Sequence, residues 1–229
     1  MPGYRGVLFD LDGTLLDTAL DFYWVADRMR ETRGLAPVDR IGFRQCVSEG
    51  ARAMVGNAFA LPLDAPEIPA LLEEFLDLYG RHMMVESRLF DGIAPLLDWL
   101  DAQNINWGIV TNKPERFSRA IIRQLGLHER CASLICPEQV GKRKPDPESL
   151  LLAGDEIGSA PHETLYIGDH QRDIEAGRRA GMITIGCLYG YIHDRDDPDL
   201  WHSDHLVRNT RELDTLLKCL YGNTESVAH

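Results

Sequence analysis

Residues 7–18 read VLFDLDGTLLDT, a short apolar run that leads into two aspartates, one residue apart, and a glycine. Residues 6–9 have no polar side chain, which is typical of a central parallel strand buried on both faces. Such strands carry ligand-binding groups at their carboxyl ends, so we expect Asp10 and Asp12 to lie at the rim of a sheet. A helix cap or a buried turn would explain one aspartate, but the second aspartate and the Gly-Thr after it favour a functional site.

The rest of the chain alternates between predicted strands and predicted helices. After the strand at 6–9, apolar runs predict strands at residues 107–110, 132–136, 165–167 and 182–187, with an edge strand near 205–207. Amphipathic helical patterns separate these runs. This alternation implies right-handed crossovers, and it predicts an α/β fold with a Rossmann-like, doubly wound parallel sheet.

Residues 17–85 interrupt the alternation, because they contain no convincing strand. Four helical patterns fill this segment, and Gly34, the residues at 48–50, Pro62 and Pro66 break the chain between them. We therefore predict a helical insertion over residues 17–85. The sheet domain would then consist of residues 1–16 and 86–229, and the residues from 223 onward are expected to be frayed.

The composition predicts a soluble protein that binds neither nucleic acid nor an anionic membrane. Apolar residues make up 44% and charged residues 26% of the 229 residues, which is an ordinary balance. The net charge of −12 would repel both of those polyanions. The five cysteines form no Cys-x-x-Cys pair and the first residues contain no apolar signal segment. We therefore expect free thiols and a cytoplasmic location, with a monomer or a homodimer as the oligomeric state.

Polar side chains follow four of the predicted strands, and they would all meet at one edge of a parallel sheet. In chain order they are Asp10 and Asp12, Thr111 and Asn112, Lys144, and Asp169 and Asp173. Each has a simpler interpretation when taken alone. Thr111 and Asn112 would cap a helix, Lys144 would be one more exposed lysine, and the last two acids would complement a helix dipole.

Taken together, these residues resemble the four motifs of the haloacid dehalogenase superfamily, in its phosphatase branch. The first motif, DxDGT, occupies residues 10–14. The resemblance implies that Asp10 attacks phosphorus and forms an aspartyl-phosphate. It also implies that Asp12 protonates the leaving alkoxide and later takes a proton from the hydrolytic water. Dehalogenases of the superfamily lack this second aspartate, so Asp12 favours phosphatase chemistry.

The resemblance also implies a magnesium site and a phosphate site. Asp10, Asp169 and the backbone carbonyl of Asp12 would supply three oxygens to Mg²⁺, which prefers oxygen ligands, and Asp173 would hold a water bound to the ion. Thr111, Asn112 and Lys144 would bind the phosphoryl oxygens. A phosphomonoester dianion repels a carboxylate nucleophile, so a divalent cation and a lysine are needed to neutralise the site. The fourth motif departs from the common pattern at His170. We expect a neutral imidazole without a direct role there, and a contact with metal-bound water or with substrate is the alternative.

The position of the helical insertion matches the small α-helical cap of the superfamily. The resemblance implies that this cap closes over the site, excludes water and chooses the substrate. Within it, Glu49, Gly50 and Arg52 are candidate substrate-binding residues, because Gly50 breaks a helical pattern beside two charged side chains. Arg52 would pair with a substrate carboxylate. An arginine that faces solvent on a helix is an equally good interpretation.

Over nearly its whole length the chain also resembles the phosphoglycolate phosphatase group. Residues 50–55, 134–137 and 189–193 bring it nearer to the members that act on N-acetylmuramic acid 6-phosphate, a compound of peptidoglycan recycling. The resemblance therefore implies this ester as the favoured substrate and 2-phosphoglycolate as the alternative. A phosphoglucomutase-type phosphotransferase would also keep both Asp10 and Asp12. A non-catalytic binding protein on this fold would be expected to lose one of the motif residues, and all are present.

Overall fold

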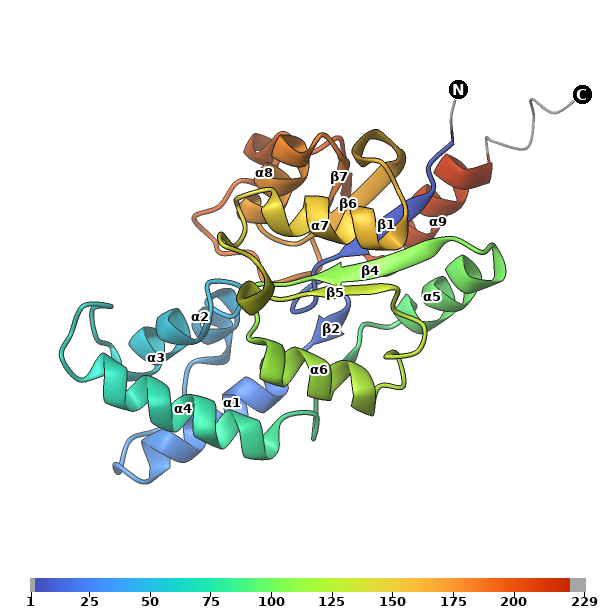
Figure 1. Ribbon diagram of the computed structural model, residues 1–229. Coiled ribbons are helices and arrows are strands. Elements are labelled where there is room, and N and C mark those ends of the chain that lie inside the picture. The colour runs from blue at the N-terminus through green and yellow to red at the C-terminus, as the bar shows by residue number, and fades with distance from the viewer. Residues whose placement is uncertain (1–2, 223–229) are drawn as a thin grey trace, which may run out of the picture.

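A six-stranded parallel sheet crosses the centre of the molecule (Figure 1). The structure is a computed structural model, and it describes residues 3–222. In spatial order the strands are β5 (Ser133–Ile135), β4 (Asn106–Val110), β1 (Gly6–Phe9), β6 (Thr164–Gly168), β7 (Ile183–Cys187) and β8 (His205–Val207). All six predicted strands are present, and the predicted α/β fold with a Rossmann-like sheet is confirmed.

Both faces of the sheet are covered by helices, which explains why β1 has no polar residue. Val7 and Phe9 belong to a core with α5 (Ile93–Ala102), α6 (Glu115–Gln124) and α9 (Thr210–Gly222). Leu8 points to the opposite face, where it belongs to a core with α7 (Glu148–Ile157) and α8 (Gln171–Ala180). Side chains alternate between the two faces of a strand, so an apolar run is buried on both sides. Three short 3₁₀ helices complete this part of the chain: η1 (Pro137–Gln139), η2 (Pro161–Glu163) and η3 (Pro198–Trp201).

Four helices lie beyond the carboxyl ends of the central strands (Figure 1). They are α1 (Ala19–Glu31), α2 (Arg40–Gln45), α3 (Ala51–Phe59) and α4 (Ile68–His82), and we call them the helical insertion. They share a hydrophobic cluster of their own, which Phe117 of α6 and Tyr191 join from the sheet side. The insertion therefore packs as a unit and contacts the rest of the protein at the rim of the sheet.

A small antiparallel ladder that we did not predict joins the two connections to the insertion. It pairs β2 (Leu16–Asp17) with β3 (Arg88–Leu89). Strands of two residues carry no periodic pattern, so the sequence gives no signal for them. The predicted boundaries at residues 17 and 85 fall beside this ladder and stay a prediction.

The frayed end predicted from residue 223 lies outside the described residues. Among the helices that the structure describes, none has the length and apolar character needed to cross a membrane.

Candidate active site

Asp10 and the turn after it are fixed by the sheet and by a glycine. The backbone N–H of Asp10 donates to the carbonyl of Ile167, at 2.8 Å, which extends the pairing of β1 with β6 by one residue. Gly13 has a φ of 85°, and a Cβ atom there would lie 2.0 Å from Oδ2 of Asp169. Only glycine fits both constraints. The turn therefore brings the first motif directly against the end of β6.

Three buried carboxylates gather at this rim, as predicted. Asp10, Asp169 and Asp173 place one oxygen each within 4.8 Å of one another, and Oδ2 of Asp173 is buried without a hydrogen-bond partner. Burial raises the pKa of Asp10 to about 6. Burial, together with the charges of Asp10 and Asp173, raises the pKa of Asp169 to about 7. A cation bound here would relieve this repulsion, and a set of oxygen ligands suits a hard ion such as Mg²⁺.

The ammonium group of Lys144 forms ion pairs with two carboxylates of this cluster. Its Nζ lies 2.9 Å from Oδ1 of Asp10 and 2.7 Å from Oδ1 of Asp173, and its side chain is 1% exposed. It also donates to the hydroxyl of Tyr166, at 2.8 Å. Although burial acts to lower the pKa of Lys144, the two carboxylates raise it, so the side chain is charged. Burial likewise acts to raise the pKa of Asp173, but Lys144 and Arg172 lower it.

Thr111 and Asn112 follow β4 and lie beside this ion pair. The amide of Asn112 donates to the backbone carbonyl of Lys144, at 3.1 Å, and so ties the loop of the lysine to the end of β4. Both residues line the same cavity as Asp10 and Lys144. The structure thus brings together the predicted core residues from four separate strand ends.

Lys113 is a site residue that we did not predict. Its Nζ lies 3.1 Å from each carboxylate oxygen of Asp12, and the hydroxyl of Thr18 donates to Oδ1 of the same carboxylate at 2.8 Å. The ammonium group also lies over the rings of Phe22 and Tyr79, which belong to the helical insertion. The carboxylate of Asp12 is therefore held by Lys113 and stands apart from the acidic cluster. The only feature of the sequence that could have indicated a role for Lys113 is its place directly after Thr111 and Asn112. Because lysines are usually exposed, this place alone does not predict a buried ion pair.

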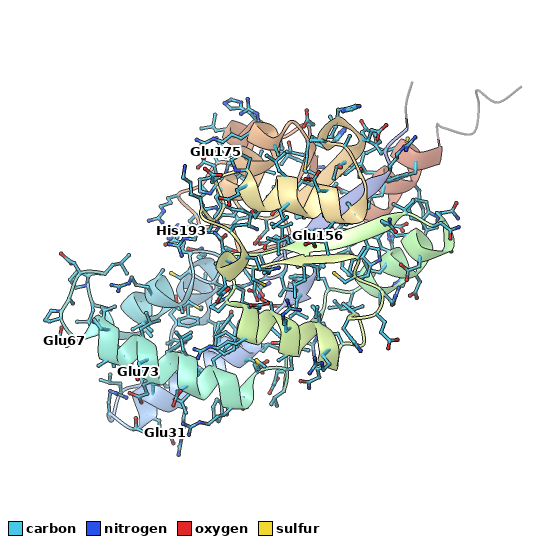
Figure 2. The ribbon with its side chains drawn as sticks, in the orientation of Figure 1. Glu31, Glu67, Glu73, Glu156, Glu175 and His193 are labelled. Atoms are coloured by element: carbon cyan, nitrogen blue, oxygen red, sulfur yellow. The ribbon has the colours of Figure 1, made fainter. Side chains whose placement is uncertain are left out.

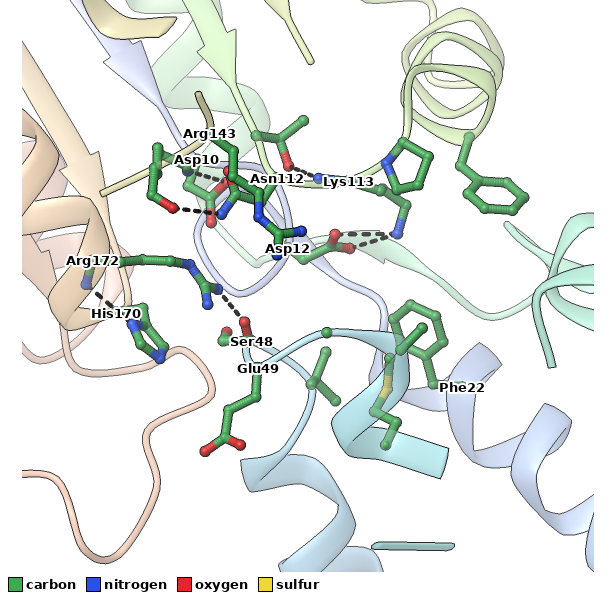
Figure 3. A pocket seen from close by; sticks show the side chains of 18 of the residues that line it. Asp10, Asp12, Phe22, Ser48, Glu49, Asn112, Lys113, Arg143, His170 and Arg172 are labelled. Carbon is green, nitrogen blue, oxygen red and sulfur yellow. Dashed lines mark hydrogen bonds and ion pairs between the residues drawn. The ribbon is translucent and has the colours of Figure 1, made fainter. Parts of the chain in front are cut away.

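A cavity of about 490 Å³ lies between the helical insertion and the rim of the sheet (Figure 3). Asp10, Asp12 and Lys144 lie on its sheet side. Its other wall is largely apolar and contains Phe22, Val47, Met54, Leu76, Tyr79 and Phe117. This volume is typical of a pocket for a small organic ligand.

Of the three candidates in the insertion, Glu49 and Gly50 line the cavity and Arg52 does not. The guanidinium of Arg52 is exposed and donates to the carbonyl of Leu63, at 2.7 Å. Ala51 and Met54, three residues apart on α3, face the cavity together. Arg52 is turned about 100° away from Ala51 by the helical repeat. The structure therefore places this predicted carboxylate ligand outside the cavity.

His170 caps the first turn of α8 and also borders the cavity. Its Nδ1 accepts a hydrogen bond from the backbone N–H of Arg172, at 3.1 Å. Burial and the nearby charge of Arg172 lower the pKa of His170 to about 4. The imidazole is therefore neutral near pH 7, as expected.

Comparison with known proteins identifies the family. Residues 7–187 match the model of the haloacid dehalogenase-like hydrolases. The chain belongs to this family. The N-acetylmuramic acid 6-phosphate phosphatase of Pseudomonas aeruginosa is 51% identical over 209 residues, which cover 91% of this chain and 92% of the relative. A phosphoglycolate phosphatase of Xanthomonas campestris is 45% identical over 209 residues, with 91% of this chain and 94% of the relative covered.

Solved structures with lower identity share the fold. A predicted phosphoglycolate phosphatase from Haemophilus somnus has a TM-score of 0.82 at 23% identity, and the match covers 95% of this chain and 99% of that one. A hydrolase from Pseudomonas syringae has a TM-score of 0.72 at 23% identity, with 94% and 98% covered. The family and the names of the relatives confirm the predicted enzyme class, a phosphomonoester hydrolase.

Proposed function

We propose that this hydrolase is Mg²⁺-dependent and works through an aspartyl-phosphate on Asp10. The observation that carries the proposal is the buried cluster of Asp10, Asp169 and Asp173, in which one carboxylate also borders the cavity. When bound at this cluster, Mg²⁺ would supply the positive charge that lets an anionic ester approach a carboxylate. Asp169 and Asp173 would hold the ion together with Asp10 and the backbone carbonyl of Asp12.

The roles of the remaining side chains follow from their places around the cavity. Asp10 forms a bond to phosphorus while the bond from phosphorus to the ester oxygen breaks. Asp12 is protonated in the complex with the ester and gives this proton to that oxygen, which leaves it as the carboxylate that pairs with Lys113. The carboxylate then takes a proton from the water that hydrolyses the aspartyl-phosphate. Thr111, Asn112 and Lys144 bind the phosphoryl oxygens and stabilise the charge that develops in transfer.

Lys113 is proposed to act through Asp12 as a positioning residue. We expect Lys113→Met to lower kcat/KM for a sugar phosphate about 100-fold, because misplacing a general acid costs on this scale. p-Nitrophenyl phosphate needs no proton on its leaving group, so its kcat/KM should change little. Steady-state kinetics on both esters provide the measurement.

The matched control for this variant is Lys142→Met, because Lys142 is exposed and lies outside the cavity. It should leave both values of kcat/KM unchanged. Equal losses on both esters in Lys113→Met would contradict the proposed role, because they would show that Lys113 supports binding or folding and not protonation.

We further propose N-acetylmuramic acid 6-phosphate as the substrate. The relative at 51% identity carries that name. The size of the cavity and its apolar wall also suit an acetylated sugar acid better than a two-carbon acid, which would fill only a small part of the space. 2-Phosphoglycolate is the second candidate, since relatives at 45% identity are named for it. The cytoplasmic location and the monomeric or homodimeric state remain predictions.

Phosphate release from N-acetylmuramic acid 6-phosphate tests the reaction type. We expect release in the presence of Mg²⁺, loss of release in EDTA, and recovery when Mg²⁺ is added in excess. Turnover that needs a sugar bisphosphate and releases little phosphate would instead identify a phosphotransferase. Binding of the ester without any turnover would identify a non-catalytic binding protein.

A further inference from the structure

We propose that Arg143 and Arg172 form a second anion subsite, which binds a carboxylate of the substrate while its phosphate lies at Asp10. This inference rests on the proposed function, and it names the chemical group that the cavity selects. The substrate class is a phosphate ester that carries a carboxylate at some distance from its phosphate.

The first support is the pairing of charges inside the cavity. Of its three acidic side chains, Asp12 is paired with Lys113, Asp10 is paired with Lys144, and Glu49 is paired with Arg195. Lys113 and Lys144 are therefore already compensated, and Glu49 is engaged by an arginine outside the cavity.

Arg143 and Arg172 also line the cavity, and within residues 3–222 neither forms an ion pair with a carboxylate at 4.0 Å or less, although the charge of Arg172 acts on the nearby Asp10 and Asp173. The chain as a whole carries a net charge of −12. Acidic side chains such as Glu31, Glu67 and Glu73 project outward from the insertion (Figure 2). Arg143 is a cation of the cavity without an ion-pair partner among the described residues, and the charge of Arg172, which also acts on Asp10 and Asp173, lies in the same cavity. Together they can attract a second anionic group of a ligand in an otherwise acidic protein.

The second support is the way in which Arg172 is held. It lies on α8 directly before Asp173, and its guanidinium donates to the backbone carbonyl of Ser48 in the helical insertion. The hydroxyl of Ser48 in turn donates to Oδ2 of Asp169, at 2.9 Å. Nε of Arg172 is buried without a hydrogen-bond partner. A fixed guanidinium with an unused donor is suited to a carboxylate, which accepts from two N–H groups at once.

Arg143 reaches the cavity from the loop that follows η1. It directly precedes Lys144, and its side chain is exposed and extends into the cavity toward the insertion (Figure 3). Its backbone is therefore set by the loop that carries the phosphate-binding lysine, while its guanidinium is free to meet a second group on the same ligand. Arg143 comes from the loop of Lys144 and Arg172 from the first turn of α8, and both line the same cavity as the apolar residues that would contact the body of the ligand.

Two esters provide a matched test of this subsite. N-acetylmuramic acid 6-phosphate differs from N-acetylglucosamine 6-phosphate only by the lactyl ether that carries the carboxylate. We expect the wild-type enzyme to prefer the muramic ester. Arg143→Gln and Arg172→Gln should each lower kcat/KM for that ester about tenfold or more, mainly through KM, as expected for one charge-assisted contact. For Arg143→Gln, kcat/KM for the glucosamine ester should stay near the wild-type value. Arg172 also supports the acidic cluster through Asp173 and Ser48, so Arg172→Gln should lower kcat/KM for the muramic ester by a larger factor than for the glucosamine ester.

Two further variants sharpen the experiment. Arg143→Lys keeps the charge and loses the bidentate geometry, so it should recover part of the activity on the muramic ester. Arg123→Gln, at an exposed position of α6 outside the cavity, should change neither ester. Equal thermal midpoints for all variants would show that they fold.

The outcomes separate this inference from the function on which it rests. Equal losses on both esters, or no loss on either, would overturn the carboxylate subsite while leaving the phosphatase intact. No Mg²⁺-dependent release from either ester by the wild-type enzyme would overturn the proposed function, and the subsite with it.

Discussion

Asp10→Asn is expected to reduce turnover by about 10⁴-fold or more, because the amide cannot attack phosphorus and loss of a nucleophile has effects of this size. The fold should be retained. Asparagine has the same shape as aspartate, and the change removes one charge from a cluster in which burial already raises the pKa of Asp10 to about 6. Phosphate release and thermal unfolding, measured on the same preparation, test both statements.

A trapping experiment makes this prediction more specific. Acid quenching of the wild-type enzyme during turnover of a ³²P-labelled ester should leave label on the peptide that contains Asp10. The Asp10→Asn enzyme should retain no label, and Asp64→Asn, an exposed acid in the insertion, should behave as the wild type does. Activity retained by Asp10→Asn, or label found on another peptide, would remove Asp10 as the nucleophile.

Lys144→Met is expected to affect both catalysis and stability. The ammonium lies 2.9 Å from Asp10 and 2.7 Å from Asp173, and all three side chains are buried. Removing one partner of a buried ion pair leaves uncompensated charge, which costs about 3–5 kcal/mol of unfolding free energy. Loss of a donor to the phosphoryl group should also lower kcat about 10²–10³-fold. Urea unfolding and steady-state kinetics provide the two measurements.

Mg²⁺ provides an internal test of the cause of this instability. Because the variant has more uncompensated negative charge, added Mg²⁺ should raise its unfolding midpoint more than it raises that of the wild type. Lys142→Met, at an exposed lysine in the same loop, should show neither effect. An unfolding free energy unchanged in Lys144→Met would contradict the account of Lys144 as the compensating charge.

The strands and the core of the site were predictable because their signals are local. A strand buried on both faces needs a continuous apolar run, as residues 6–9 show, and parallel strands deliver their carboxyl ends to one edge. The positions of Asp10 and Asp169, which directly follow β1 and β6, agree with that rule. The ladder of β2 with β3 was missed because two residues carry no period.

The side-chain partnerships were less predictable, since they join residues far apart in the chain. Lys113 and Asp12 are 101 positions apart, and the packing of the insertion against the sheet places the ammonium over the rings of Phe22 and Tyr79. Arg52 lies in the expected segment, but the helical repeat turns it out of the cavity. Arg143 and Arg172 become candidates for anion binding only when the ion-pair partners of the other charged residues in the folded cavity are known.

The most direct test of the account is kcat/KM for N-acetylmuramic acid 6-phosphate and for 2-phosphoglycolate, measured side by side with Mg²⁺ present. We predict a preference of about 100-fold for the muramic ester, equivalent to about 2.7 kcal/mol of transition-state binding. The same preference for 2-phosphoglycolate would contradict the account, because a two-carbon substrate would leave the apolar wall of the cavity unused.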